Sequence, residues 1–175
     1  MFLYNEVQKR EANQERVRVG LIGAGKFGSM FLSQVPFTIG LEVISIVDIC
    51  VENAKKNCRD VGWTKEQIES VLFFDNLKKM ISQTKIDVLV EATGDPVEGT
   101  KHALIAIEQG LDIVMVNVEA DVLSGPYLAK EAEKAGIVYS MAYGDQPALT
   151  TELVEWARAS GFNVVAAGKG TKYLP

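Results

Sequence analysis

Three glycines and one acid lie at a spacing that suits the binding of a dinucleotide. The segment Gly23–Gly28 reads Gly-x-Gly-x-x-Gly, and Asp48 follows twenty residues after its last glycine. In such a loop the first glycine allows a sharp turn, the second admits a pyrophosphate and the third lets a helix pack closely. The helix N-terminus then offers free N–H groups to the phosphates. We therefore expect cofactor contacts from Gly23, Gly25, Lys26, Phe27 and Gly28.

The segments around these glycines have the hydrophobic pattern that this interpretation requires. Val17–Ile22 precedes the loop and is predicted to be a strand, and Leu41–Val47 is predicted to be a second strand that ends at Asp48. A carboxylate in that position can accept hydrogen bonds from ribose hydroxyls. Strand, loop, helix, strand and acid together predict binding of a nicotinamide dinucleotide. The alternative is a sheet whose glycines only form a tight turn.

A second group of candidates follows the predicted fourth strand, which with its exit covers residues 87–94. Its continuous apolar character indicates burial on both faces, as in a parallel sheet. We expect the backbone at Ala92 and Gly94 to approach the cofactor, and Thr93 to bond a ribose or phosphate; a simple turn is the alternative. Glu91 either contacts the cofactor or substrate, or is satisfied by N–H groups of the loop.

Two polar residues follow the predicted fifth strand, residues 112–116, in an expected loop over residues 117–121. A polar side chain there can orient the nicotinamide carboxamide or a substrate. Asn117 is therefore predicted to bind the cofactor, and Glu119 is a catalytic candidate. Helix capping is the alternative for both, and the next helix is expected only over residues 126–135.

Lysines near the end of the chain are the other catalytic candidates. Lys169 and Lys172 follow a predicted seventh strand at residues 163–167, in a Gly-Lys-Gly-Thr-Lys run that suits a substrate phosphate or carboxylate. A flexible boundary is the alternative. His102, the one histidine, lies within a helix predicted over residues 96–108 and is interpreted as a surface residue, because helix interiors rarely reach a crevice.

Strands alternate with helices along the chain, which predicts an α/β fold: a Rossmann-type doubly wound parallel sheet in three layers, α/β/α. The expected strand order is 3-2-1-4-5-6, with one strand added or diverted. Ligands in such sheets bind at the carboxyl ends of the strands, where the order reverses. We expect residues 1–16 to form an N-terminal helix, residues 17–160 a dinucleotide-binding domain and residues 161–175 the start of a truncated substrate or C-terminal domain.

The length, net charge and cysteine content of the chain exclude several classes of protein. The 175 residues suffice for one domain, and a net charge of −5 argues against nucleic acid or an acidic membrane surface as partner. No apolar run is long enough to span a bilayer, and no secretory signal is visible. Two cysteines, Cys50 and Cys58, have neither metal-ligand spacing nor good disulfide geometry, which favours the cytoplasm and predicts no metal site.

These motifs resemble the N-terminal half of homoserine dehydrogenases. The resemblance covers about residues 17–170 and looks closest to the homoserine-dehydrogenase-like oxidoreductases that carry a SAF domain, a group that includes an NADPH-using reductoisomerase of deoxyxylulose phosphate. The matching segments are Val19–Gly25, Val47–Asp48, Val90–Gly94, Val114–Asp121, Ala132–Gly136 and Ala167–Thr171.

The resemblance implies a cofactor-binding domain whose catalytic lysines and acids lie further along, in a substrate domain. One departure matters, because homoserine dehydrogenases have an Asn-Lys pair after the fifth strand, and here Val118 and Glu119 follow Asn117. A carboxylate cannot replace an ammonium group against an anionic substrate, which argues against homoserine itself.

The predicted function is therefore NAD(P)-dependent hydride transfer between the nicotinamide and a small carbonyl or hydroxy substrate, such as a sugar phosphate or an amino-acid-related alcohol. Asp48 favours NAD, because it repels a 2′-phosphate; Lys55, Lys56 and Arg59 favour NADP. A homo-oligomer is expected. The alternative function is a dinucleotide-sensing or regulatory module without chemistry.

Overall fold

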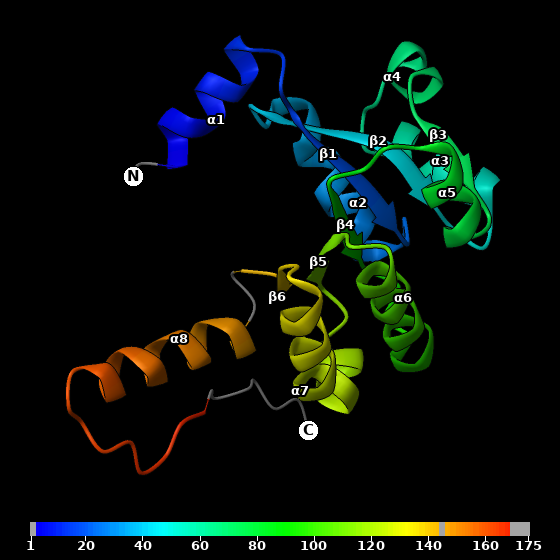
Figure 1. The fold of residues 1–175 in the computed structure, drawn as a ribbon. Helices are drawn as coiled ribbons and strands as arrows, with labels where there is room; N and C mark the ends of the chain where they lie inside the picture. The colour runs from blue at the N-terminus through cyan, green and yellow to red at the C-terminus, as the bar shows by residue number, and fades with distance from the viewer. Residues whose placement is uncertain (1–2, 144–145, 169–175) are drawn as a thin grey trace, which may run out of the picture.

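The computed structural model describes residues 3–143 and 146–168, and it contains one six-stranded parallel sheet (Figure 1). The strand order is β3-β2-β1-β4-β5-β6, which confirms the predicted doubly wound Rossmann-type sheet. The order reverses between β1 and β4, which pair in parallel. The strands are β1 (Val17–Ile22), β2 (Leu41–Val47), β3 (Leu72–Phe74), β4 (Val88–Glu91), β5 (Asp112–Met115) and β6 (Tyr139–Met141).

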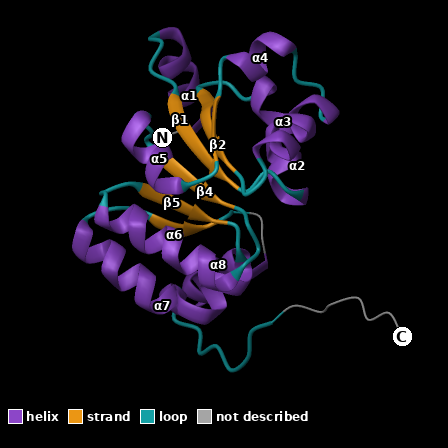
Figure 2. Ribbon diagram, turned by 90° about the vertical axis from the view of Figure 1, so that its right-hand side faces the viewer, coloured by secondary structure: helices purple, strands orange, loops and turns teal. Residues whose placement is uncertain are grey.

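Helices cover both faces of the sheet (Figure 2), which confirms the three layers. The helical segments are α1 (Leu3–Ala12), α2 (Lys26–Gln34), the 3-10 turn η1 (Val35–Phe37), α3 (Val51–Asp60), α4 (Lys65–Glu69), α5 (Leu77–Gln83), α6 (Pro96–Glu108), α7 (Val118–Ala135) and α8 (Gln146–Ala159).

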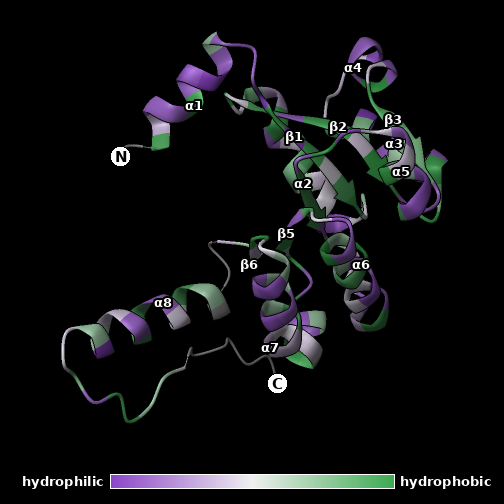
Figure 3. Ribbon diagram, in the orientation of Figure 1, coloured by the Kyte–Doolittle hydropathy of each residue, from purple (hydrophilic) through white to green (hydrophobic). Residues whose placement is uncertain are grey.

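Two hydrophobic clusters hold the layers together, one on each face of the sheet, and the strands between them are the most apolar part of the ribbon (Figure 3). On one face Leu32 of α2 and Cys58 of α3 pack with Trp63. On the other face the cluster includes Met80 of α5, Ala103 of α6 and Leu128 of α7. Burial also raises the pKa of the Cys58 thiol to about 11, so this cysteine behaves as a core residue.

The glycine loop leaves β1 in a conformation that only small residues allow. Gly23 has φ of +90°, and a Cβ on Gly28 would lie 2.1 Å from the carbonyl oxygen of Gly23. The first turn of α2 therefore rests directly on the loop, as the third glycine of the motif requires. Gly25 differs, because a Cβ there would meet no atom within 4 Å.

The structure differs from the sequence-based prediction at the fifth strand's exit. Residues 117–121 were expected to form a loop before a helix at Pro126, since proline favours a first turn. Helix α7 instead begins at Val118, with Asn117 as its N-cap and with Glu119 and Asp121 in its first turn. Acids in a first turn interact favourably with the helix dipole, so the helix starts before the proline.

The predicted seventh strand is also wrong, because residues 163–167 form no regular structure. Val165 is 90% exposed. A strand needs a neighbour for its backbone hydrogen bonds, and within the described residues β6 pairs with β5 alone. Helix α8 and the segment after it extend away from the β6 edge (Figure 1).

The contact between Gly28 and Gly23 gives a stability prediction. Gly28→Ala forces α2 away from the loop, and we expect it to lower the free energy of unfolding by about 1–3 kcal/mol. Gly25→Ala is the matched control, because its Cβ enters open space; it should change stability by less than about 1 kcal/mol. Urea denaturation of both variants measures the difference, and equal losses would contradict the packing argument.

Candidate functional site

A pocket of about 870 Å³ lies at the carboxyl ends of the strands, where the strand order reverses. Gly23, Gly25, Asp48 and Thr93 line it, so the structure brings together candidates that the sequence placed on three separate segments. Its other walls are the start of α5 and one side of α6. The volume lies in the range of small-molecule and cofactor sites.

Hydrogen bonds from two neighbouring segments hold the glycine loop in place. The Ala24 amide donates to Asp48 Oδ2 at 2.9 Å, and the amide of Cys50 donates to Asp48 Oδ1 at 2.9 Å. On the carbonyl side of the same residue, Asn57 Nδ2 and Ser29 Oγ donate to the Ala24 carbonyl, at 2.8 and 3.1 Å. The loop is therefore ordered before any ligand binds.

The start of α2 has the properties of an anion site. Gly25 is the N-cap, and no side chain caps the helix. The first N–H groups of a helix have no partner within the helix, and here Lys26 and Phe27 carry them beside the open space at Gly25. Backbone N–H groups and the helix dipole favour a phosphate at this point. The residues present thus fit the pyrophosphate of a dinucleotide.

The ribose position is set by Asp48, which is half-buried at the end of β2. Each carboxylate oxygen already accepts one backbone N–H. A carboxylate has about four lone-pair sites, so it can still accept hydroxyl groups from a ribose. Because both oxygens are held, the side chain has a fixed orientation toward the pocket that it lines.

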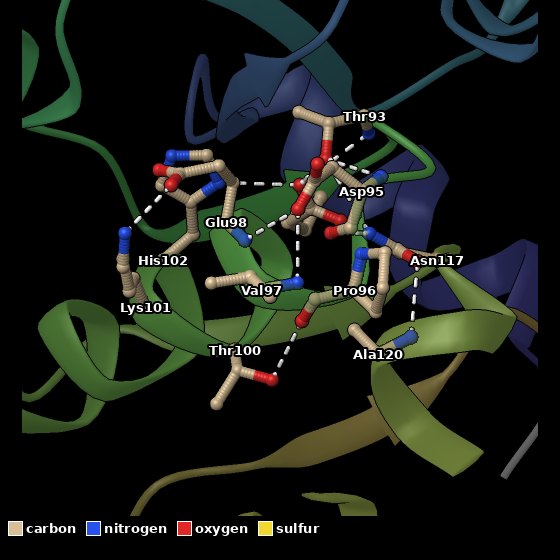
Figure 4. A network of polar contacts seen from close by, with 11 residues as sticks. Thr93, Asp95, Pro96, Val97, Glu98, Thr100, Lys101, His102, Asn117 and Ala120 are labelled. Carbon is tan, nitrogen blue, oxygen red and sulfur yellow. Dashed lines mark hydrogen bonds and ion pairs between the residues drawn. The ribbon is translucent and has the colours of Figure 1, made fainter. Parts of the chain in front are cut away.

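The exit of β4 is a connected polar network (Figure 4). Glu91 is fully buried, and its Oε1 accepts bonds from the Thr93 amide at 3.3 Å and the Thr93 hydroxyl at 2.5 Å. The Thr93 hydroxyl in turn accepts a bond from the Asp95 amide at 3.4 Å. Gly94 has φ of +77°, and a Cβ there would meet no atom within 4 Å. Thr93 is thus held at the pocket wall by Glu91.

Asn117 is 2% exposed, and its amide ties the β4 exit to the start of α7 (Figure 4). Its Oδ1 accepts the Ala120 amide at 3.1 Å, and its Nδ2 donates to the Asp95 carbonyl at 2.8 Å and to the Thr93 hydroxyl at 3.4 Å. Direct binding of the cofactor by Asn117 stays a prediction. The geometry shows that Asn117 caps α7 and fixes the exit loop of β4 beside the pocket.

Of the three catalytic candidates, the structure describes only Glu119, and it lies apart from this pocket. Glu119 is exposed in the first turn of α7 and is not among the lining residues. Lys169 and Lys172 lie outside the described residues. Tyr139 on β6 donates to Asp121 Oδ1 at 2.8 Å, and burial together with that bond raises its pKa, so it is a poor proton donor.

The interpretation of His102 as a surface residue is wrong. Its side chain is 16% exposed, lines the pocket from α6, and its Nδ1 lies 3.2 Å from Glu91 Oε1. A signal for this existed in the sequence, because Glu98, His102 and Ile105 follow the i, i+4, i+7 spacing of one helix face. Those three residues all line the pocket.

Sequence reasoning also missed Asn57 and the start of α5. Asn57 holds the glycine loop from α3, but one asparagine in a polar helix gives no signal of that contact. Asn76, which caps α5, lines the pocket with Leu77. Within the described residues no group of three or more His, Cys, Asp or Glu side chains is placed to hold a metal ion. None of the described helices has the length and apolarity to cross a membrane.

Two models of known protein families match this chain. A model described as the NAD binding domain of homoserine dehydrogenase matches residues 19–143, and a model described as the catalytic domain of oxidoreductase DRL matches residues 144–175. No curated protein matches the chain.

Solved structures of dehydrogenases share the fold. The WlbA dehydrogenase from Bordetella pertussis, in complex with NADH and UDP-GlcNAcA, is 21% identical with a TM-score of 0.63, over 83% of this chain and 40% of that one. A homoserine dehydrogenase from Thiobacillus denitrificans is 17% identical with a TM-score of 0.61, and the match covers 72% of this chain and 29% of that one. A myo-inositol dehydrogenase from Corynebacterium glutamicum is 15% identical with a TM-score of 0.59, and the match covers 83% of this chain and 41% of that one. The chain thus spans less than half the length of each.

The buried amide of Asn117 gives a second prediction. Asn117→Ala removes the cap and leaves the Asp95 carbonyl without its donor, so we expect a loss of about 2–3 kcal/mol in the free energy of unfolding. Asn76→Ala is the matched control, since Asn76 is an exposed cap that bonds only the amides of its own helix, at 2.9 and 3.3 Å. It should cost about 1 kcal/mol. Equal losses in urea denaturation would show that Asn117 is no more than a cap.

Proposed function

Because the chain belongs to the family of homoserine dehydrogenase NAD-binding domains, we propose that it positions a nicotinamide dinucleotide for hydride transfer in a longer oxidoreductase. The substrate is a small carbonyl or hydroxy compound, such as a sugar phosphate or an amino-acid-related alcohol. The observation that carries this proposal is the pocket in which Gly25, Asp48 and Thr93 converge at the reversal of strand order. The dehydrogenases of the same fold support it.

Each part of the cofactor has a group of this chain to receive it. The N–H groups of Lys26 and Phe27 receive the pyrophosphate, and the carboxylate of Asp48 receives the ribose hydroxyls. The loop of Ala92 and Thr93 continues this surface toward β5. The nicotinamide supplies the hydride chemistry when bound, and the protein supplies orientation and a fixed set of dipoles.

A substrate other than homoserine fits the exit of β5 better. Val118 follows Asn117, where the resemblance to homoserine dehydrogenases would put a lysine, and the next residue, Glu119, is an exposed acid in the first turn of α7. We place the chain with the relatives that carry a SAF domain and act on compounds such as deoxyxylulose phosphate. In this proposal residues 161–175 begin the substrate domain, with Lys169 and Lys172 as candidates for its first catalytic groups.

The alternative is a regulatory module that binds the dinucleotide and catalyses nothing. One observation favours it: within residues 91–95 and 115–119, at the ends of β4 and β5, there is neither a lysine nor a tyrosine to exchange a proton with a substrate. Activity of the longer protein with any hydride acceptor separates the two functions.

The proposal also includes a cytoplasmic homo-oligomer that binds neither nucleic acid nor a membrane. The exposed apolar residues of α8 support association, since Leu153 and Trp156 are each 65% exposed. The net charge of −5 supports the absence of nucleic acid. The unpaired thiols of Cys50 and Cys58 support a reducing compartment.

We predict that the 175-residue chain binds NADH but does not turn over. Binding is measured by the fluorescence of the nicotinamide, with Gly25→Val as the control that places a side chain where the pyrophosphate lies; it should weaken affinity at least about tenfold. Turnover is measured by nicotinamide absorbance with aldehydes, keto acids and sugar phosphates. Absence of NADH binding to the folded chain contradicts the proposed function. Sustained oxidation of NADH would put the catalytic group within these residues.

We predict further that NADH binds more tightly than NADPH, by about fivefold or more, because Asp48 cannot move away from a 2′-phosphate. Of the three basic residues that favour NADP, Lys55 and Lys56 pair with Glu52 and Asp60, while no ion pair of Arg59 is found within the described residues. Asp48→Asn should reduce the preference, and Glu131→Gln, an equal charge change on α7 away from the pocket, should preserve it. Titration with both cofactors decides the matter, and tighter binding of NADPH by the wild type refutes the argument.

A further inference from the structure

The contact between His102 and Glu91 is the feature of the pocket that cofactor binding in general does not explain. Glu91 is fully buried, its Oε1 accepts two hydrogen bonds from Thr93, and His102 Nδ1 lies 3.2 Å from the same oxygen. Its Oε2 is buried without a hydrogen-bond partner. Such an arrangement is costly in a protein interior, which suggests that it has a function.

This contact fixes the tautomer of the imidazole. Oε1 already accepts the amide and the hydroxyl of Thr93. With Oε1 as the acceptor of this contact too, His102 Nδ1 carries the hydrogen. A neutral imidazole has one N–H group, and its other nitrogen is then an acceptor. Within the described residues Nε2 of His102 has no hydrogen-bond partner. The side chain therefore offers a fixed acceptor at the pocket wall.

The surroundings of His102 match a flat aromatic base. The pocket runs from Gly25, the phosphate position, past Asp48, the ribose position, to a region between the start of α5 and the face of α6. Leu77 of α5 and Ile105 of α6 line that region and supply apolar walls. Charged residues of α6 line the pocket as well, and two of them, Glu98 and Lys101, pair with each other. Apolar walls with a fixed acceptor between them suit a purine that carries an amino group.

We infer that His102 Nε2 accepts a hydrogen bond from the exocyclic amino group of adenine, and that Glu91 acts as the positioning residue that holds the required tautomer. The inference rests on the proposed function, since it concerns the adenosine half of the same dinucleotide. It makes His102 a specificity-determining residue. A hypoxanthine base, which has an oxygen in place of the amino group, would present an acceptor to an acceptor.

Binding of NAD and of nicotinamide hypoxanthine dinucleotide tests the inference by calorimetry. The wild-type chain should bind NAD about tenfold more tightly than the analogue, because a polar group facing a like group loses its hydrogen bond. His102→Phe keeps a flat ring without the acceptor, and its two affinities should agree within about twofold. Lys134→Ala, a change on α7 at a residue that does not line the pocket, should keep the wild-type ratio.

The role of Glu91 has a spectroscopic readout, because the chain has one histidine and its imidazole ¹⁵N signals are unambiguous in untagged protein. The wild type and Glu91→Gln, whose amide oxygen can still accept, should show the hydrogen on Nδ1. Glu91→Met should show a mixture of tautomers and a reduced preference for NAD over the analogue. Urea denaturation of each variant establishes that it is folded.

The outcomes separate the inference from the proposed function. Equal affinity of the wild type for both dinucleotides, an unchanged ratio in His102→Phe, or a hydrogen on Nε2 in the wild type would each overturn the role of His102 and leave the cofactor site intact. Failure of the folded wild type to bind either dinucleotide would overturn both.

Discussion

The close approach of α2 to the end of β1 is the constraint on which the rest of the site depends. A Cβ on Gly28 would lie 2.1 Å from the Gly23 carbonyl oxygen, so no other residue allows the helix to begin so near the sheet. This approach places the unpaired N–H groups of the first helical turn at the carboxyl edge of the strands. Asp48 then accepts a bond from the Ala24 N–H at 2.9 Å, and Asn57 donates to the Ala24 carbonyl at 2.8 Å, so both peptide groups that flank Ala24 are held. The site is therefore preorganised, which reduces the entropy lost on binding.

A second constraint acts at the exits of β4 and β5. The buried side chains of Glu91 and Asn117 both bond Thr93, which ties the two loops together next to the glycine loop. Buried polar networks of this kind specify one arrangement of loops, because each group that loses its partner is costly. The same network orients His102 at the pocket wall. Packing and recognition in this domain thus share the same hydrogen bonds.

Much of the fold and of the cofactor pocket could be predicted from the sequence, because the motifs that determine them are local. The glycine spacing, the apolar strands and Asp48 predict the strand order that the structure confirms. Long-range contacts could not be predicted in this way: the bond from Asn57 to the loop joins residues 33 apart, and the Glu91–His102 contact joins a strand to a helix face. The apolar run at 163–167 was misread as a strand because its pattern carries no information about whether a neighbouring strand exists.

The central claim is that a dinucleotide lies across the start of α2 and the end of β2. The most direct test is a titration of ¹⁵N-labelled protein with NAD, followed through backbone amide resonances. The account predicts the largest shifts at Lys26, Phe27 and Thr93, with little change in the groove between α1 and β2 that contains Phe37. Shifts confined to that groove, or spread evenly over the surface, would contradict it.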